Sequence, residues 1–504
     1  MLEPRKLPTH PRRPASARTR SRFALAAAAI TSVLVMTAEA EPPPEPREPT
    51  ETAIHVAEIQ WQPHRFVPEE GEAVDAELGV LAVPENRDAA ESRLIDLHFV
   101  RFKSTSKTPG SPIVYLAGGP GGSGISTAKG RRFPLFMALR AHADVIAFDQ
   151  RGTGLSNSVP TCEFPERPPF DRPAERAWVG EYLERQARHC AAFWAEQGID
   201  LDGYDTAQSA DDLETLRLAL GAKQLSLWGI SYGTHLAFSA LDRHPKSFDR
   251  AILASAEGPD DTIKRPARTD ALFAAVDARL DGQWLPTMRR AVDRLRKEPA
   301  VVTTSLPGVG EVKVGIGAFD LQLIISWMAA DPHNLARLVA WAPDLADGDY
   351  SRLAPIVAGL RMRFHTLDAM SVAMDAASGA TDERRRLIRK ERGQALLGDA
   401  LNFPMLPDWP VADWLGIEEL PDAFRRPPRS AVPALFLSGS LDGRTYTSSH
   451  RELAAGFDRA SFVVVDGAGH NLFMSSPEVE ARMLDFLARG ETSDDTIKVK
   501  TFLD

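Results

Sequence analysis

Apolar and polar residues follow two different rhythms along this chain. From residue 73 to 102 apolar positions alternate with polar ones, which predicts an opening antiparallel hairpin. Beyond it, short apolar runs alternate with helical patterns, which is typical of a mainly parallel sheet covered by helices. The strands expected in that sheet are 112–116, 143–148, 225–228, 250–254, 433–437 and 460–465. The predicted fold class is therefore α/β.

The strand rhythm disappears between about residues 260 and 429. Helical patterns rich in Ala, Leu and Arg replace it, and prolines frame the segment at both ends. We therefore expect a helical cap, 259–429, inserted between two parts of an α/β core, 53–258 and 430–490. The last segment, 491–504, is expected to be a loose tail.

The first 40 residues differ in composition from the rest. Seven basic residues precede an apolar run from Phe23 to Met36, and Ala38-Glu39-Ala40 follows it, which predicts a signal peptide over 1–40. The run is shorter than the roughly 20 residues that a membrane-spanning helix needs. We expect an exported protein, periplasmic or secreted, without stable membrane insertion once the signal is removed. The proline-rich segment 41–52 is expected to be a solvated tether.

Charge and cysteine content narrow the function classes. A formal net charge of -10 argues against a nucleic-acid partner, because proteins bind the phosphate backbone of nucleic acids through basic surfaces. The two cysteines, Cys162 and Cys190, can pair in an exported chain, and the bond would stabilise the fold by about 3 kcal/mol; two buried thiols are the alternative. The sequence carries no metal-ligand cluster, nucleotide motif or cofactor signature, so we expect no cofactor. It carries no signal for an oligomeric state.

A G-x-S-x-G motif lies where a predicted strand runs into a predicted helix. It reads Gly229-Ile230-Ser231-Tyr232-Gly233. A nucleophilic serine in such a turn needs small neighbours two residues before and after it, so that strand and helix can pass closely. We therefore interpret Ser231 as a candidate nucleophile.

A glycine-rich loop, residues 118–124, follows the buried strand 112–116. A phosphate-binding loop would require a following Lys-Ser or Lys-Thr pair or a well-spaced G-x-G-x-x-G, and neither is present. We favour an oxyanion loop, in which bare backbone amides approach a reacting carbonyl, with Gly119 and Tyr232 as donors. The charged residues after the next strand, Asp149 and Arg151, are expected to hold their loop by hydrogen bonds.

Three residues that could form a catalytic triad each lie at the end of a predicted strand: Ser231, Asp442 and His470. They occur in the chain order nucleophile, acid, base. Ser231 would attack a carbonyl, His470 would carry its proton, and Asp442 would orient the imidazole. Glu257, at the end of the strand after the serine motif, is a rival for the acid. Three motifs in this order at strand ends arise by chance much less often than any one of them.

Five segments together resemble the α/β-hydrolase serine peptidases of the prolyl aminopeptidase and tripeptidyl aminopeptidase type. They are GGPGGSG, DQRGTGLS, GISYGTHLA, GSLDGRT and DGAGH, and the resemblance covers about residues 74–258 and 430–488. It implies an α/β-hydrolase fold, an exopeptidase with Ser231, Asp442 and His470 as its triad, an oxyanion hole of Gly119 and Tyr232, and a cap that restricts access. Acidic residues in the cap of such enzymes hold the substrate's amine; candidates here are Glu257, Asp331, Glu418 and Glu419.

Three functions remain open at this point. The first is a serine exopeptidase that releases proline or short peptides from peptide N-termini. The second is an esterase or other acyl hydrolase, because the same triad serves both kinds of carbonyl. The third is a binding protein without activity, which the intact candidate triad disfavours. The expected ligand is a peptide or a small acyl substrate.

Overall fold

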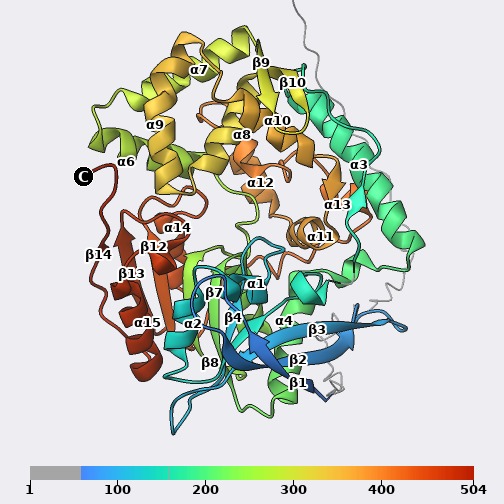
Figure 1. The fold of residues 1–504 in the computed structure, drawn as a ribbon, viewed down its shortest axis with the longest axis vertical. Coiled ribbons are helices and arrows are strands. Elements are labelled where there is room, and N and C mark those ends of the chain that lie inside the picture. The colour runs from blue at the N-terminus through green and yellow to red at the C-terminus, as the bar shows by residue number, and fades with distance from the viewer. Residues whose placement is uncertain (1–57, 158) are drawn as a thin grey trace, which may run out of the picture. The chain divides into compact units, whose positions relative to one another are not determined.

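The computed structural model describes residues 58–504 except residue 158, and its centre is a ten-stranded sheet (Figure 1). The predicted signal peptide and tether lie outside the described residues. The strand order is β1-β2-β3-β5-β4-β7-β8-β12-β13-β14. Three antiparallel strands open the sheet: β1 (Gln60–Phe66), β2 (Val74–Pro84) and β3 (Leu94–Phe102).

The remaining strands of this sheet run parallel to one another. They are β5 (Val145–Phe148), β4 (Ile113–Leu116), β7 (Leu225–Ser231), β8 (Phe248–Ala256), β12 (Ala434–Gly439), β13 (Ala460–Asp466) and β14 (Ile497–Lys498). Parallel strands need crossover connections, and the helices between them supply these. The predicted α/β class with a mainly parallel sheet is confirmed.

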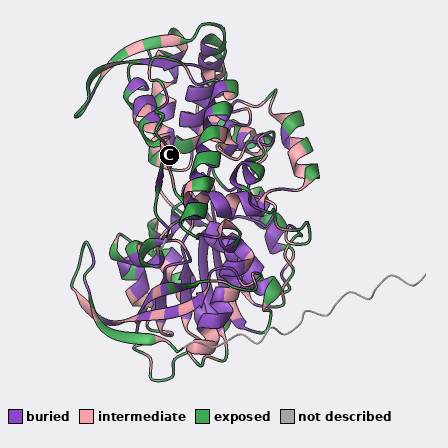
Figure 2. Cartoon of the chain, turned by 90° about the vertical axis from the view of Figure 1, so that its right-hand side faces the viewer, coloured by how far each residue is buried: buried purple, intermediate pink, exposed green. Residues whose placement is uncertain are grey.

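Helices cover both faces of the sheet, and the central strands are buried (Figure 2). Successive residues of β7 serve opposite faces: Leu225 and Leu227 belong to one apolar core, Trp228 and Ile230 to the other. The first core includes α4 (Thr206–Ala219), α5 (Tyr232–Arg243) and α14 (Thr447–Ala454). The second includes α1 (Gly124–Lys129), α2 (Phe133–Leu139) and α15 (Pro477–Arg489).

Residues 259–429 gather on one side of the sheet (Figure 1), and most of them surround an apolar core of their own, whereas 369–377 and 411–417 pack into the first core of the sheet. Their helices are α6 (Pro266–Arg279), α7 (Trp284–Lys297), α8 (Ala318–Met328), α9 (Pro332–Asp347), α10 (Ala354–Arg363), α11 (Ala369–Ser378), α12 (Asp382–Glu391) and α13 (Val411–Leu415). The segment is not purely helical. An antiparallel hairpin, β9 (Ala300–Leu306) and β10 (Gly310–Ile316), stands inside it, because two alternating runs flank a Pro-Gly turn.

A segment that precedes the serine motif also packs against the cap. Strand β6 (Cys162–Glu163) pairs with β11 (Thr366–Leu367), and helix α3 (Arg176–Glu196) contacts α13. The disulfide between Cys162 and Cys190, predicted above as one of two options, is present and joins β6 to α3. It therefore anchors the strand that meets the cap.

The C-terminal segment is ordered into the sheet rather than loose. Ile497 pairs with Val465 and is 1% exposed, because its side chain joins the apolar core beneath β13. Across residues 58–504, leaving out 158, no helix combines the length and the hydropathy of a membrane span.

Removing the disulfide should lower stability. Replacing both Cys162 and Cys190 by Ala should reduce the free energy of unfolding by about 3 kcal/mol, since the bond restricts the unfolded chain across 28 residues. Urea unfolding measures the difference. Reduction with dithiothreitol should lower the free energy of unfolding of the wild type and leave that of the double variant unchanged. A wild type whose stability does not respond to reduction would contradict the prediction.

Candidate active site

Ser231 lies at the junction of β7 and α5 in a conformation that L-residues rarely adopt. Its φ is 54° and its ψ is -129°. A Cβ on Gly229 would lie 2.7 Å from the Gly233 carbonyl oxygen, and one on Gly233 would lie 2.1 Å from that of Leu116. Both neighbours must therefore be glycine, as the motif predicts. The turn presents Ser231 at the carboxyl edge of the sheet.

The glycine-rich loop passes directly over this serine. A Cβ on Gly118 would lie 3.0 Å from the Ser231 Cβ and 3.6 Å from its Oγ. Gly119 has a φ of 131°, and the Gly122 amide donates to the Gly118 carbonyl at 3.0 Å, which curls the loop back on itself. Bare backbone therefore stands closest to the hydroxyl. Tyr232, as the first residue of α5, has an amide without an intrahelical acceptor.

Asp149 holds the helix that follows the glycine loop. Its carboxylate accepts hydrogen bonds from the Ser123 hydroxyl at 2.6 Å and from the amides of Ile125 at 3.0 Å and Leu155 at 2.8 Å. Burial raises the pKa of Asp149, and these donors oppose the rise. Arg151 is fully buried and binds Asp212 through two nitrogens, at 2.7 and 2.8 Å. The structural role expected for both residues is confirmed.

Asp442 and His470 meet on the loops after β12 and β13. The His470 Nδ1 lies 2.9 Å from Asp442 Oδ2 and 3.1 Å from Oδ1. The same carboxylate accepts from the Arg444 amide at 2.8 Å, and from the amide and hydroxyl of Thr445 at 3.0 and 2.8 Å. Burial would raise the Asp442 pKa, but the His470 ring and the Thr445 amide outweigh it, and the pKa lies well below its usual range.

The histidine loop is fixed beside the serine through its backbone. The Ser255 hydroxyl donates to the His470 carbonyl at 2.9 Å, and Ser255 precedes Ala256, which pairs with Ser231 across the sheet. The His470 amide donates to the Ala330 carbonyl of the cap at 2.9 Å. Within the described part of the chain, Ser231 makes no hydrogen bond to the His470 ring. In ligand-free structures this contact is often long and tightens when substrate binds.

Glu257, the rival acid, does not contact His470. Its carboxylate pairs with Lys264 Nζ at 3.2 Å, and its amide donates to the Thr234 hydroxyl at 2.7 Å. That hydroxyl in turn donates to the Ser231 carbonyl at 2.7 Å. The carboxylate that pairs with His470 is therefore that of Asp442. Glu257 lies next to the serine turn, where it is 5% exposed.

A second carboxyl group, Asp375 of α11, lies near Glu257. Burial raises the pKa of Asp375 to about 8, and the charge of Glu257 adds to the rise while Lys264 opposes it. Asp375 also contributes to the raised pKa of the Tyr232 hydroxyl, so it is close to the residue after the serine. Two carboxyl groups and one ammonium therefore cluster beside the serine turn.

The other acidic candidates in the cap have different surroundings. Asp331 caps α9 by accepting from the amides of His333 and Asn334, at 2.9 and 3.1 Å. Glu419 pairs with Arg385 at 2.7 Å and with Arg425 at 3.1 Å, and Glu418 is exposed. Of the four candidates, Glu257 is the one tied to the serine turn.

Sequence reasoning missed Asp375 and Ser255. Asp375 is the one charged residue in the helix AMSVAMDAAS, and an isolated charge on an apolar helix is a signal that could have found it. Ser255 carries no such signal: its φ of 46° and its bond to the His470 backbone depend on contacts distant in sequence.

Family models match both parts of the α/β core. The model described as alpha/beta hydrolase fold matches residues 111–299, and the model described as TAP-like protein matches residues 408–498. The first match contains Ser231 and the glycine loop, and the second contains Asp442 and His470.

Curated relatives match a limited stretch. Serine protease Hip1 from Mycobacterium tuberculosis is 28% identical over 219 residues, 40% of this chain and 40% of that protein. Tripeptidyl aminopeptidase from Streptomyces coelicolor is 29% identical over 223 residues, 41% of this chain and 39% of that protein. The chain therefore spans about two fifths of the length of the curated relatives it matches.

Solved structures are matched loosely. A proline iminopeptidase-related protein from Thermus thermophilus is 17% identical with a TM-score of 0.35, over 81% of this chain and 96% of that one.

Asp375→Asn should flatten the pH dependence of stability. Because the folded-state pKa of Asp375 is raised, its stabilising contribution is complete below the unfolded-state pKa and is lost as pH rises through about 8. An asparagine stays neutral, so the variant should gain stability relative to the wild type as pH rises from about 5 to 8. Urea midpoints across this range measure the gain. Asp347→Asn, at an exposed carboxylate, is the control. A difference in urea midpoint between Asp375→Asn and wild type that does not change with pH would refute the prediction.

Proposed function

We propose that this chain, which has the α/β-hydrolase fold, is a serine exopeptidase that releases N-terminal residues, proline or short peptides, from peptide substrates. The observation that carries the proposal is the pairing of His470 with Asp442 at 2.9 Å beside the strained turn of Ser231. All three side chains follow the carboxyl ends of parallel strands, where open α/β sheets place their sites. The TAP-like match and the two peptidase-named relatives support a peptide substrate.

The reaction proceeds in two halves in this proposal. Ser231 Oγ attacks the scissile carbonyl while His470 accepts its proton, and Asp442 stabilises the imidazolium that forms. His470 then protonates the leaving amine, which departs and leaves the released residues esterified to Ser231. Water, deprotonated by the same imidazole, attacks this ester and regenerates the serine. The low pKa of Asp442 keeps it ionised throughout at neutral pH.

Backbone amides supply the oxyanion hole. Gly119 and Tyr232 are the proposed donors, and the passage of the glycine loop within contact of Ser231 supports this assignment. Losing one such donor typically costs about 3 kcal/mol of transition-state stabilisation. The bare loop is needed here because a Cβ at Gly118 would press on the Ser231 side chain.

Glu257 and Asp375 form the proposed subsite for the free amine of the substrate. An ammonium buried beside the serine turn needs anionic acceptors, and these two carboxyl groups lie near that turn. Lys264 balances Glu257, so the charge available to an incoming ammonium comes from ionisation of Asp375. This cluster favours a peptidase over an esterase, which would need an apolar pocket.

An exported location, periplasmic or secreted, is also part of the proposal. The Cys162–Cys190 disulfide supports it, because disulfides persist in oxidising compartments and are rare in the cytosol. The basic and apolar pattern of residues 1–40 points the same way.

A substrate panel tests the activity. The chain should hydrolyse Pro-, Ala- or tripeptidyl-arylamides in preference to short-chain nitrophenyl esters. Ser231→Ala should abolish turnover, and Asp442→Asn should lower kcat roughly 10⁴-fold because the imidazole loses its orienting carboxylate. Ser305→Ala, at an exposed serine of β9, is the matched control. Turnover of esters alone would favour the esterase, and Ser231→Ala activity equal to wild type would refute the serine mechanism.

A second experiment tests the amine subsite. Asp375→Asn and Glu257→Gln should each raise KM for free-amine arylamides by roughly 10- to 100-fold, because a hydrogen bond to a charged group contributes about 1.5–3 kcal/mol. Hydrolysis of nitrophenyl esters, which lack the amine, should hardly change. Glu418→Gln removes an exposed cap carboxylate as the control. Equal losses on both substrate classes would show a structural role instead.

A further inference from the structure

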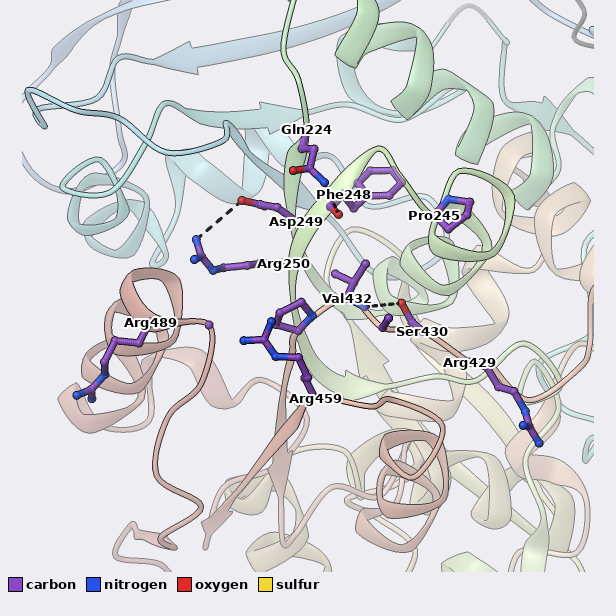
Figure 3. Close-up of a pocket in the computed structure, with 13 residues that line it drawn as sticks. Gln224, Pro245, Phe248, Asp249, Arg250, Arg429, Ser430, Val432, Arg459 and Arg489 are labelled. Atoms are coloured by element: carbon purple, nitrogen blue, oxygen red, sulfur yellow. Dashed lines mark hydrogen bonds and ion pairs between the residues drawn. The ribbon is translucent and has the colours of Figure 1, made fainter.

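A cavity of about 470 Å³ lies at the amino ends of the central parallel strands (Figure 3). Its walls come from the residues that precede or begin β7, β8, β12 and β13, together with the end of α15. They include Gln224, Asp249, Arg250, Val432, Arg459 and Gly490. Ser231, Asp442 and His470 follow the other ends of the same strands. At about 3.3 Å per residue, the seven residues of β7 separate the two sites by roughly 20 Å.

The charge around this cavity is unbalanced. Four arginines line it, at positions 250, 429, 459 and 489, against one carboxylate, Asp249. That carboxylate already accepts from the hydroxyls of Ser226 at 2.7 Å and Ser111 at 3.0 Å. Arg250 lies 3.9 Å from it, beyond hydrogen-bond distance. In a chain whose net charge is -10, this is a local excess of positive charge.

Two of the guanidinium groups converge on one point. A methyl group at Gly490 would lie 3.3 Å from Arg459 Nη2 and 3.8 Å from Arg250 Nε. The Arg250 Nε is buried and has no hydrogen-bond partner. Within residues 58–504, excluding 158, Arg459 has no ion pair, whereas Arg489 is paired with Asp485. Arg250 and Arg459 therefore carry donors that the protein itself leaves unused.

We propose that this cavity binds a phosphate-type oxyanion, either inorganic phosphate or the phosphate group of a monoester. A buried guanidinium donor without an acceptor is costly, and an anion between Arg250 and Arg459 supplies acceptors to both. A phosphate offers several oxygens to two guanidinium forks at once. The volume leaves room for an organic group, and Phe248 and Val432 form an apolar wall beside it. The site is independent of the reaction proposed for Ser231.

Isothermal titration of the full chain with inorganic phosphate tests the site, at constant ionic strength set with sodium chloride so that general screening is equal throughout. Wild type should bind phosphate saturably. Arg459→Ala and Arg250→Ala should each weaken binding at least tenfold. Arg188→Ala, on the exposed face of α3, removes one positive charge elsewhere and should bind like wild type. Arg459 is exposed, so its variant should keep the wild-type unfolding temperature without phosphate.

Two further probes distinguish the source of the phosphate group. Phenyl phosphate that competes with inorganic phosphate would identify a soluble monoester. Vesicles that contain phosphatidic acid, a lipid phosphomonoester, and bind wild type but not Arg459→Ala would identify a lipid headgroup. Absence of saturable binding for all three probes, or unchanged affinity in Arg459→Ala and Arg250→Ala, would overturn the proposal.

Discussion

The backbone of Ser231 is held at a positive φ, and the candidate active site is built around that constraint. A residue in this region costs on the order of 1–3 kcal/mol, so the surroundings must impose it. Glycines at 229, 233 and 118 let a strand, a helix and a loop converge where any Cβ would collide. The Thr234 hydroxyl then holds the Ser231 carbonyl and the Glu257 amide together. One strained residue thus organises the loop above it, the helix after it and the carboxyl group beside it.

The cap braces the loops that carry Asp442 and His470. The connection between α8 and α9 contacts both of these loops. A Cβ at Gly443 would lie 2.4 Å from the Ala329 carbonyl, and one at Gly469 would lie 2.6 Å from that of Ala330. The Ala330 carbonyl also accepts the His470 amide. The backbone of His470 is fixed by the cap on one side and by Ser255 on the other, and its ring is oriented separately by Asp442. Movement of this connection would therefore shift the acid and the base together.

Features that depend on neighbouring residues could be predicted from the sequence, and features that depend on distant contacts could not. The strand, turn and helix around Ser231, and the turns that carry Asp442 and His470, follow from local glycine and apolar patterns. The partnership of Asp375 with Glu257 joins residues more than 100 positions apart, and no local pattern encodes it. The tail shows the same limit. Ile497 belongs to a largely polar terminus in the sequence, yet it pairs with β13 because its side chain is buried in the second apolar core.

The two ends of the parallel strands have opposite chemistry, and the direction of the chain explains why. Parallel strands all begin on one side of the sheet and end on the other. Residues that precede the strands therefore collect at their amino ends, and residues that follow them collect at their carboxyl ends. The carboxyl ends of the strands gather Ser231, Glu257 and Asp442, and the two carboxylates pair there with Lys264 and His470. The amino ends of the strands gather Arg250 and Arg459, whose guanidinium groups both lie beside Gly490. The buried strands between them keep the two electrostatic environments apart, so each edge can hold a charge balance that the other does not share.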